Sequence, residues 1–136
     1  MANLAAASQV FAFRNFFLRQ THSFILVEWK NVDYNLGNFF DGTYFTVPEN
    51  GLYSFYACCL QNSSNYGQIY LYLNNNLHIY AERAESKNSY GFVNIVTTLK
   101  LVKNDKVDVR FIGDFYETND GRTTYFRGRM VARLDE

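Results

Sequence analysis

Side chains that could perform acid–base chemistry are scarce in this chain. Only two of its 136 residues are histidine, His22 and His78, and histidine is the side chain whose ordinary pKa lies closest to neutral pH. Neither histidine stands in a motif that would pair it with a nucleophile or a metal ion. We therefore interpret both as structural or surface residues, and we expect no enzymatic activity.

Three carboxylates, Asp114, Glu117 and Asp120, are spaced by three residues within the polar segment 114–122. Carboxylate oxygens are ligands that Ca²⁺ accepts, but this segment lacks the ligand order of a known calcium-binding loop. The favoured interpretation is that these groups are solvated, and we expect no cofactor. Calcium held by these carboxylates stays open as the alternative.

Three polar segments, 61–67, 82–90 and 114–122, have a composition that suits recognition. Amides and carboxylates bond hydroxyl groups, and a tyrosine ring offers a flat face to a sugar ring. We predict that these segments form a ligand site, with simple solvation as the alternative. The candidate ligand-binding residues are Tyr66, Tyr90, Tyr116, Asn119, Asp120 and Arg122.

The two cysteines are adjacent, which limits what they can do. In an extended strand Cys58 and Cys59 point to opposite faces and cannot easily bond to each other. Cys59 shares the face of Tyr53 and is expected to be buried, whereas Cys58 shares the face of Tyr56. We expect reduction to leave the fold intact. Asn62 begins a glycosylation sequon, which is used only if the chain passes through a secretory compartment.

The composition indicates one sheet-rich domain. Aromatic residues make up 18% of the chain and hydrophobic residues 48%, which is enough for a core and favours strands, on which flat rings pack well. Thirteen basic residues balance thirteen acidic ones, so bulk charge attracts neither nucleic acid nor an anionic membrane. No apolar run approaches the roughly 18 residues of a membrane span.

Alternating side chains and turn signals predict closely spaced strands. A polar break is expected at 21–23 and a loop at 31–38. Pro48 lies in a corner between two strands, where Asn50-Gly51 supplies a pair that tolerates positive φ. The expected strands are 10–14, 16–18, 24–27, 42–45, 51–60, 68–74, 77–81, 92–101, 107–112 and 123–134.

The clearest alternation predicts a hairpin with a tight turn at 74–76. Its inner face would carry the aliphatic residues Ile69, Leu71, Leu73, Leu77, Ile79 and Ala81. Its outer face would carry Tyr70, Tyr72, His78 and Tyr80. This outer face is therefore rich in tyrosine rather than in charge.

The corner resembles the signature of the complement C1q globular head, within the tumour-necrosis-factor-like superfamily. The matching positions are Gly37, Phe40, Gly42, Phe45, Pro48, Gly51, Tyr53 and Phe55, supported by Ala12-Phe13, Leu99-Lys100-Leu101, Asp105 to Val107 and Phe126-Arg127-Gly128. Two departures are Asn104, where the family has glycine, and a closing strand that is unusually basic. The resemblance implies an all-β jelly roll of two antiparallel sheets. Residues 1–9 would be a flexible tail and residues 10–136 the head domain.

The resemblance also implies a homotrimer. One face of strands 52–60 and 92–101 carries large apolar groups opposite the core stripe, and a soluble monomer rarely leaves such a face exposed. The expected interface residues are Leu52, Tyr56, Cys58, Phe92 and Val96. Arg127, Arg129 and Arg133 are expected to share one face of the closing strand, where subunit contacts are favoured over an anionic ligand.

The function expected from this resemblance is that of a secreted, non-catalytic lectin or pattern-recognition protein of innate immunity, although residues 1–10 do not form a good secretory signal. It would bind carbohydrate or microbial surface ligands through the end of the domain that carries 61–67, 82–90 and 114–122. The alternatives are a cytokine-like or synaptic-organiser-like ligand for a protein receptor, and an extracellular structural or biomineral matrix protein. Strongly acidic chains suit the mineral role, so the neutral charge counts against it.

Overall fold

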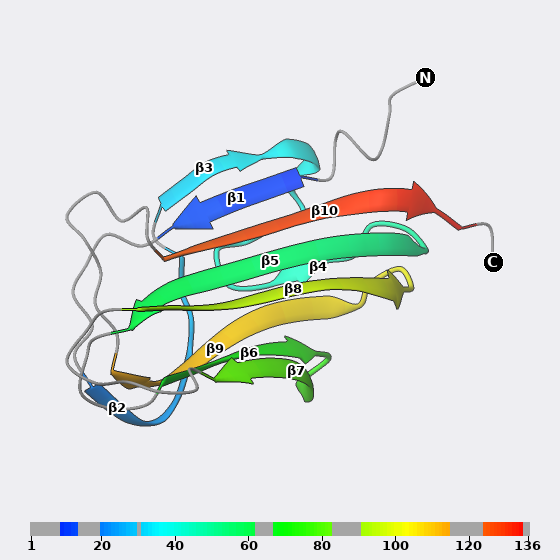
Figure 1. The fold of residues 1–136 in the computed structure, drawn as a ribbon. Helices are drawn as coiled ribbons and strands as arrows, with labels where there is room; N and C mark the ends of the chain where they lie inside the picture. Colours follow the sequence, from blue (N-terminus) through cyan, green and yellow to red (C-terminus); the bar gives the residue numbers. More distant parts are fainter. Residues whose placement is uncertain are drawn as a thin grey trace.

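The computed structural model describes residues 9–13, 20–29, 31–61, 67–82, 91–114 and 124–134. The regular elements among these residues are all strands, apart from one short 3-10 helix (Figure 1). The elements are β1 (Gln9–Phe13), β2 (Gln20–Leu26), β3 (Asn31–Asn35), η1 (Leu36–Asn38), β4 (Phe45–Thr46), β5 (Gly51–Gln61), β6 (Gly67–Leu73), β7 (Asn76–Glu82), β8 (Gly91–Leu101), β9 (Lys106–Asp114) and β10 (Tyr125–Arg133).

Two antiparallel sheets make up the sandwich. Sheet A has the strand order β3-β1-β10-β5-β8, and sheet B has the order β2-β9-β6-β7, with β4 also paired to β9. From β5 onward the chain changes sheet at every connection except the β6–β7 hairpin (Figure 1). This alternation between two packed sheets defines a jelly roll, and the predicted fold class is confirmed.

Alternating side chains of both sheets fill the space between them. In β5, Tyr53, Phe55 and Ala57 are buried while the residues between them are not. Phe126 of β10 stacks on Phe55, with ring centroids 5.9 Å apart, and on Trp29 at 6.0 Å. Flat rings therefore join the layers at the centre of the core, which explains the high aromatic content of the chain.

The corner around Pro48 is fixed by hydrogen bonds to neighbouring turns. The Asn50 side-chain oxygen accepts from the backbone N–H of Lys103 at 2.9 Å, and the Asn50 carbonyl accepts from Leu134 at 3.0 Å. The Tyr53 hydroxyl donates to the Glu49 carbonyl at 2.6 Å. These bonds connect three chain segments that lie far apart in sequence.

We had expected glycine at position 51 to provide a positive φ. The structure shows that glycine is required there for space instead. Gly51 is not among the positive-φ residues, but a Cβ at this position would lie 2.6 Å from the carbonyl oxygen of Ala132. At Asn104 the structure explains the missing family glycine, because asparagine tolerates its φ of 76°.

The close approach at Gly51 predicts the effect of adding one methyl group. We expect Gly51→Ala to lower the free energy of unfolding by about 1–3 kcal/mol, because a backbone carbonyl must move. Gly128→Ala should destabilise the protein to a similar extent, because its Cβ would lie 2.9 Å from the ring of Phe55, which is only 1% exposed and packed against other rings of the core. Urea unfolding of both variants measures the two losses. An unchanged midpoint for Gly51→Ala would contradict this account.

The N-terminal part of the structure corrects three strand predictions. The expected break at 21–23 lies inside β2, and the expected loop at 31–38 contains β3 and η1. Both strands lie at sheet edges, where polar residues are tolerated because one side faces solvent. The strand expected at 42–45 is reduced to β4, because the Asp41 carboxylate accepts bonds from the N–H groups of residues 43 and 44 and forms a turn. Residues 16–18 lie outside the described part of the chain.

Candidate functional site

The six predicted ligand-binding residues, Tyr66, Tyr90, Tyr116, Asn119, Asp120 and Arg122, lie outside the described residues. So does Glu117, and the side chain of Asp114 is not described either. The strand ends that flank these segments do lie together, because Gln61 pairs with Gly91 and Gly67 with Gly113. They form the left end of the molecule in Figure 1.

The tight turns meet at the opposite end. The Asn74 side chain donates to Asp105 at 2.9 Å, and the backbone N–H of Asn104 donates to the carbonyl of Val47 at 2.8 Å. One end of the sandwich is thus closed by hydrogen-bonded turns.

A row of aromatic and polar groups covers the outer face of sheet B. We name it the tyrosine platform and define it as Gln68, Tyr70, Tyr72, Tyr80 and Arg110. Tyr70 lies opposite Tyr80 in the hairpin and opposite Arg110 in the next pair of strands. The rings of Tyr70 and Tyr80 stack with centroids 5.4 Å apart. Tyr80 is 52% exposed whereas Tyr70 is 7% exposed, so the ring of Tyr80 is presented to solvent while the ring of Tyr70 is covered.

A buried carboxylate holds the charged end of the platform. The Arg110 Nε donates to Asp108 Oδ1 at 2.9 Å, and the Asp108 side chain is only 1% exposed. The Arg110 guanidinium lies 3.8 Å from the centre of the Tyr72 ring and also donates to Asn75 at 2.7 Å. The hydrogen bond with Asp108 raises the pKa of Arg110. The cation is thus held over a ring.

Amide and carboxylate groups continue the platform toward the strand ends that flank the predicted recognition segments. The Gln68 side chain donates to Glu82 and accepts from the Tyr70 hydroxyl. Gln68 and Glu82 pair across the hairpin close to its open end. Hydrogen-bonding groups and a flat ring are therefore adjacent here.

The sequence analysis placed the three platform tyrosines on this face but missed Asp108 and Arg110. The alternation Val107-Asp108-Val109-Arg110-Phe111 signals that the two charges share a face opposite an apolar one. Leu77 was predicted wrongly. Leu71 pairs with Ile79 but Tyr72 pairs with Leu77, so a bulge turns Leu77 outward and leaves it 49% exposed. His78 is exposed and lies at the same bulge, between Leu77 and Ile79.

The outward face of sheet A carries the predicted interface residues. Val96 lies directly opposite Tyr56 in the β5–β8 pair. Phe92 is 56% exposed and Val96 is 64% exposed, whereas Leu52 and Tyr56 are half-buried. Large apolar groups are therefore left uncovered in the single chain.

Cys58 behaves differently from its neighbours on this face. It is a free thiol that is only 4% exposed in the single chain. Burial raises the pKa of Cys58 to about 11, and a hydrogen bond with Tyr125 opposes this rise. Tyr125 in turn stacks on Tyr56 with centroids 5.5 Å apart. Cys59 is likewise a thiol outside any disulfide, and it is fully buried in the core, as expected.

The raised pKa of Cys58 predicts that stability falls in alkaline solution. Between pH 9.0 and about 11, the unfolded chain releases the thiol proton while the folded chain keeps it, so the free energy of unfolding decreases as pH rises. Urea unfolding below, within and above this window measures the decrease, and Cys58→Ala should make it shallower. An identical pH profile for the variant would rule out Cys58 as a source.

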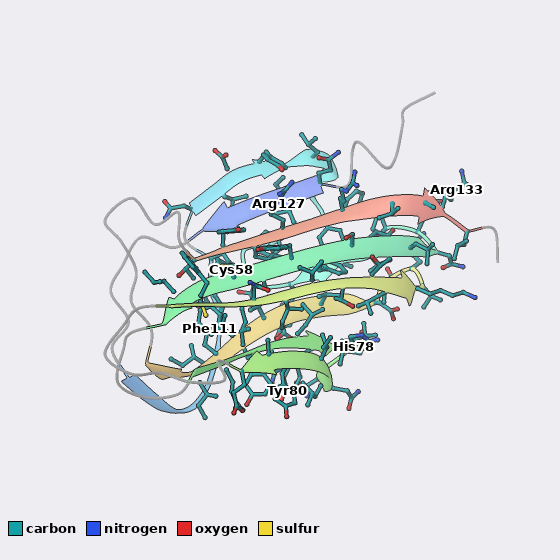
Figure 2. The ribbon with its side chains drawn as sticks, viewed as in Figure 1. Cys58, His78, Tyr80, Phe111, Arg127 and Arg133 are labelled. Atoms are coloured by element: carbon teal, nitrogen blue, oxygen red, sulfur yellow. The ribbon has the colours of Figure 1, made fainter. Side chains whose placement is uncertain are left out.

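The closing strand corrects the prediction for the arginines. Arg127 and Arg129 share the outward face of sheet A, opposite Tyr56 and Ser54 respectively. A register shift between Met130 and Ala132 places Arg133 opposite Gly51, which is a position of the other face. There Arg133 lies 3.5 Å from Glu49. The basic stripe therefore consists of two arginines, Arg127 and Arg129. Arg133 lies at the far end of β10 from Arg127 (Figure 2).

Within the described part of the chain, no three His, Cys, Asp or Glu residues gather into a group that could hold a metal ion. A search of the same residues finds no helix that is long and apolar enough to cross a membrane.

Comparison with known proteins agrees with the fold. The family model of the C1q domain matches residues 11–131, so the chain belongs to the C1q domain family. No curated protein matches it in sequence. This fold is consistent with a non-catalytic ligand-binding module.

Several solved structures are similar to this chain. The globular domain of zebrafish complement 1qA has 18% identity and a TM-score of 0.75, covering 93% of this chain and 99% of its own. Murine APRIL at pH 5.0 has 12% identity and a TM-score of 0.70, covering 93% and 98%. Eiger TNF from S. frugiperda has 12% identity and a TM-score of 0.67, covering 95% of each chain. At these identities the likeness concerns the fold alone.

Proposed function

We propose that this chain is a secreted, non-catalytic recognition module that binds carbohydrate on microbial or other cell surfaces as a homotrimer in innate immunity. The observation that carries the proposal is the half-exposed ring of Tyr80, stacked on Tyr70 and followed by the hydrogen-bonding groups of Gln68 and Glu82. An aromatic face beside amide and carboxylate groups can bind the apolar face and the hydroxyls of a sugar together.

The platform and the predicted recognition segments would form one continuous site. β6 begins at Gly67 and β7 ends at Glu82. The segments 61–67 and 82–90 are therefore joined to the two platform strands at the same end of the hairpin. Tyr66, Tyr90, Tyr116, Asn119, Asp120 and Arg122 remain the candidate contacts beyond it. Each contact in such an open site is weak, so useful affinity depends on three heads that engage one surface together.

The trimer is supported by the uncovered apolar groups on sheet A. Phe92 and Val96 project from the same face as Tyr56, and assembly around a three-fold axis would remove them from water. The family implies the same assembly.

Calcium at Asp114, Glu117 and Asp120 is not needed for this function, and chelation should leave sugar binding unchanged.

A glycan array followed by titration of the best sugar tests this function. We expect Tyr80→Ala to weaken binding about tenfold, the factor that corresponds to about 1.4 kcal/mol. The triple variant of Tyr116, Asp120 and Arg122 to alanine should weaken it as well. His78→Ala is the matched control, because His78 is exposed on the same strand as Tyr80.

The possible outcomes separate the competing functions. If only Tyr80→Ala loses binding, the site lies on the platform. If only the triple variant loses binding, the site lies on the predicted segments. An array without any bound glycan contradicts the lectin function and favours a ligand for a protein receptor, for which the exposed platform would be the contact surface. The neutral net charge continues to count against a mineral-binding role.

A further inference from the structure

A hollow of about 200 Å³ lies on the outward face of sheet A, where β10 runs between β1 and β5. Its polar lining comes from four strands: Gln9, Tyr34, Ser54, Tyr56, Arg127 and Arg129. The pairing registers explain the convergence, because Arg127 lies opposite Tyr56, and Arg129 lies opposite both Ser54 and Gln9. The hollow therefore forms only because the sheet places these four strands next to one another.

The charge in this hollow is unbalanced. Both arginines are exposed, and no carboxylate is among the described residues that line it. The third arginine of the strand does not add to it, since the register shift sends Arg133 toward Glu49. Two guanidinium groups therefore stand side by side, two residues apart on one strand face.

The chemistry of the lining selects for an oxyanion. Guanidinium groups present fork-shaped donors that match the oxygens of phosphate or sulfate. The hydroxyls of Tyr34, Tyr56 and Ser54 and the amide of Gln9 are further donors. A metal cation would be repelled by the two arginines, and an uncharged sugar would leave both guanidinium groups without a counter-charge.

The position of the hollow connects this charge to assembly. Val96 and Tyr56, which belong to the proposed trimer interface, also line the hollow. If this face is covered by other copies, as the proposed function requires, the guanidinium groups lose water without gaining a counter-charge from their own lining. Burial of unpaired charge is strongly unfavourable. A bound anion would remove this cost.

We propose that the hollow lined by Arg127 and Arg129 binds a small tetrahedral oxyanion, such as free phosphate or sulfate, and that this binding stabilises the homotrimer. The anion is enclosed when the copies assemble, so the site is distinct from the open sugar-binding surface at the platform. Binding and assembly then strengthen each other by the same factor, as linkage requires.

Analytical ultracentrifugation of the purified chain in phosphate and in chloride, at matched pH and ionic strength, tests this proposal. Matched ionic strength removes general screening from the comparison. We expect saturating phosphate to shift the trimer dissociation constant by about 5- to 150-fold, the usual range for coupled sites. Calorimetric titration of the wild-type trimer with phosphate should show saturable binding.

Variants decide whether the arginines are responsible. In the double variant Arg127→Gln with Arg129→Gln, phosphate should neither bind nor shift the dissociation constant. Arg133→Gln is the matched control and should keep both responses, because that arginine lies away from the hollow. Circular dichroism establishes that each variant is folded.

The two proposals fail in different ways. A stable trimer that neither binds phosphate nor responds to it overturns the anion site but leaves the recognition function standing. A trimer that is insensitive to phosphate but dissociates in the double glutamine variant also overturns it, since the counter-charge then comes from a partner copy. A chain that is monomeric in both buffers overturns the trimer itself and with it the coupling proposed here.

Discussion

Val96→Lys should convert the protein from a trimer to a monomer. Val96 is 64% exposed in the single chain and lies opposite Tyr56 on the outward face of sheet A, so the substitution leaves the protomer core untouched. In the assembly it would place three ammonium groups in an apolar interface, next to the arginines of the hollow that Val96 helps to line. Each 1.4 kcal/mol changes an equilibrium constant about tenfold, so even that cost per copy weakens the trimer by about a thousandfold.

Light scattering at micromolar concentration measures this change. The wild-type chain should have about three times the 15.9 kDa mass of one chain, and the variant should have the mass of one. Leu77→Lys is the matched control, since Leu77 is 49% exposed on β7, which belongs to sheet B. Val96 is a sharper probe than Tyr56, whose ring stacks on Tyr125 within the protomer. A trimeric Val96→Lys variant would move the interface elsewhere.

Phe126→Ala should cause the largest loss of protomer stability. Phe126 is 1% exposed and packs against Phe55, Trp29 and Phe40, with ring centroids within 6.0 Å of its own. Its removal leaves a cavity that rings from both layers cannot fill. We expect a loss of about 3–5 kcal/mol, which corresponds to a fall of roughly 10–20 °C in melting temperature.

Thermal and urea unfolding at one protein concentration measure the loss, because assembly makes stability depend on concentration. Val102→Ala is the control and should change the free energy of unfolding by less than about 0.5 kcal/mol, as surface substitutions usually do. A fall of only a few degrees for Phe126→Ala would mean that the aromatic stack does not hold the two layers together.

Much of the fold could be read from local pattern. The alternation in β5 and β8 predicted which side chains enter the core, because successive residues of a strand point to opposite faces. The hairpin turn was equally readable, since Asn74 and Asn75 both adopt positive φ, which asparagine tolerates. In each case the physical cause lies within a few residues of the chain. The same locality placed Tyr70, Tyr72 and Tyr80 on one face.

The rest depended on which strands lie side by side. Polar residues in β2 and β3 became strand residues only because each segment pairs along an established strand. The Arg110 guanidinium reaches the Tyr72 ring, and Arg127 and Tyr34 line one hollow, through pairings between distant segments. The residue pattern within one segment cannot predict contacts of this kind with another segment.

Register was the other quantity that sequence alone did not determine. A shift of one residue moves a side chain to the opposite face, and two such shifts changed the surfaces described above. One turns Leu77 outward beside the platform, and the other separates Arg133 from Arg127 and Arg129. Bulges form where the twist and pairing of neighbouring strands demand an extra residue. For that reason the sequence alone determined the sandwich and its core, whereas the tertiary structure decided which charges and rings meet on its two outer faces.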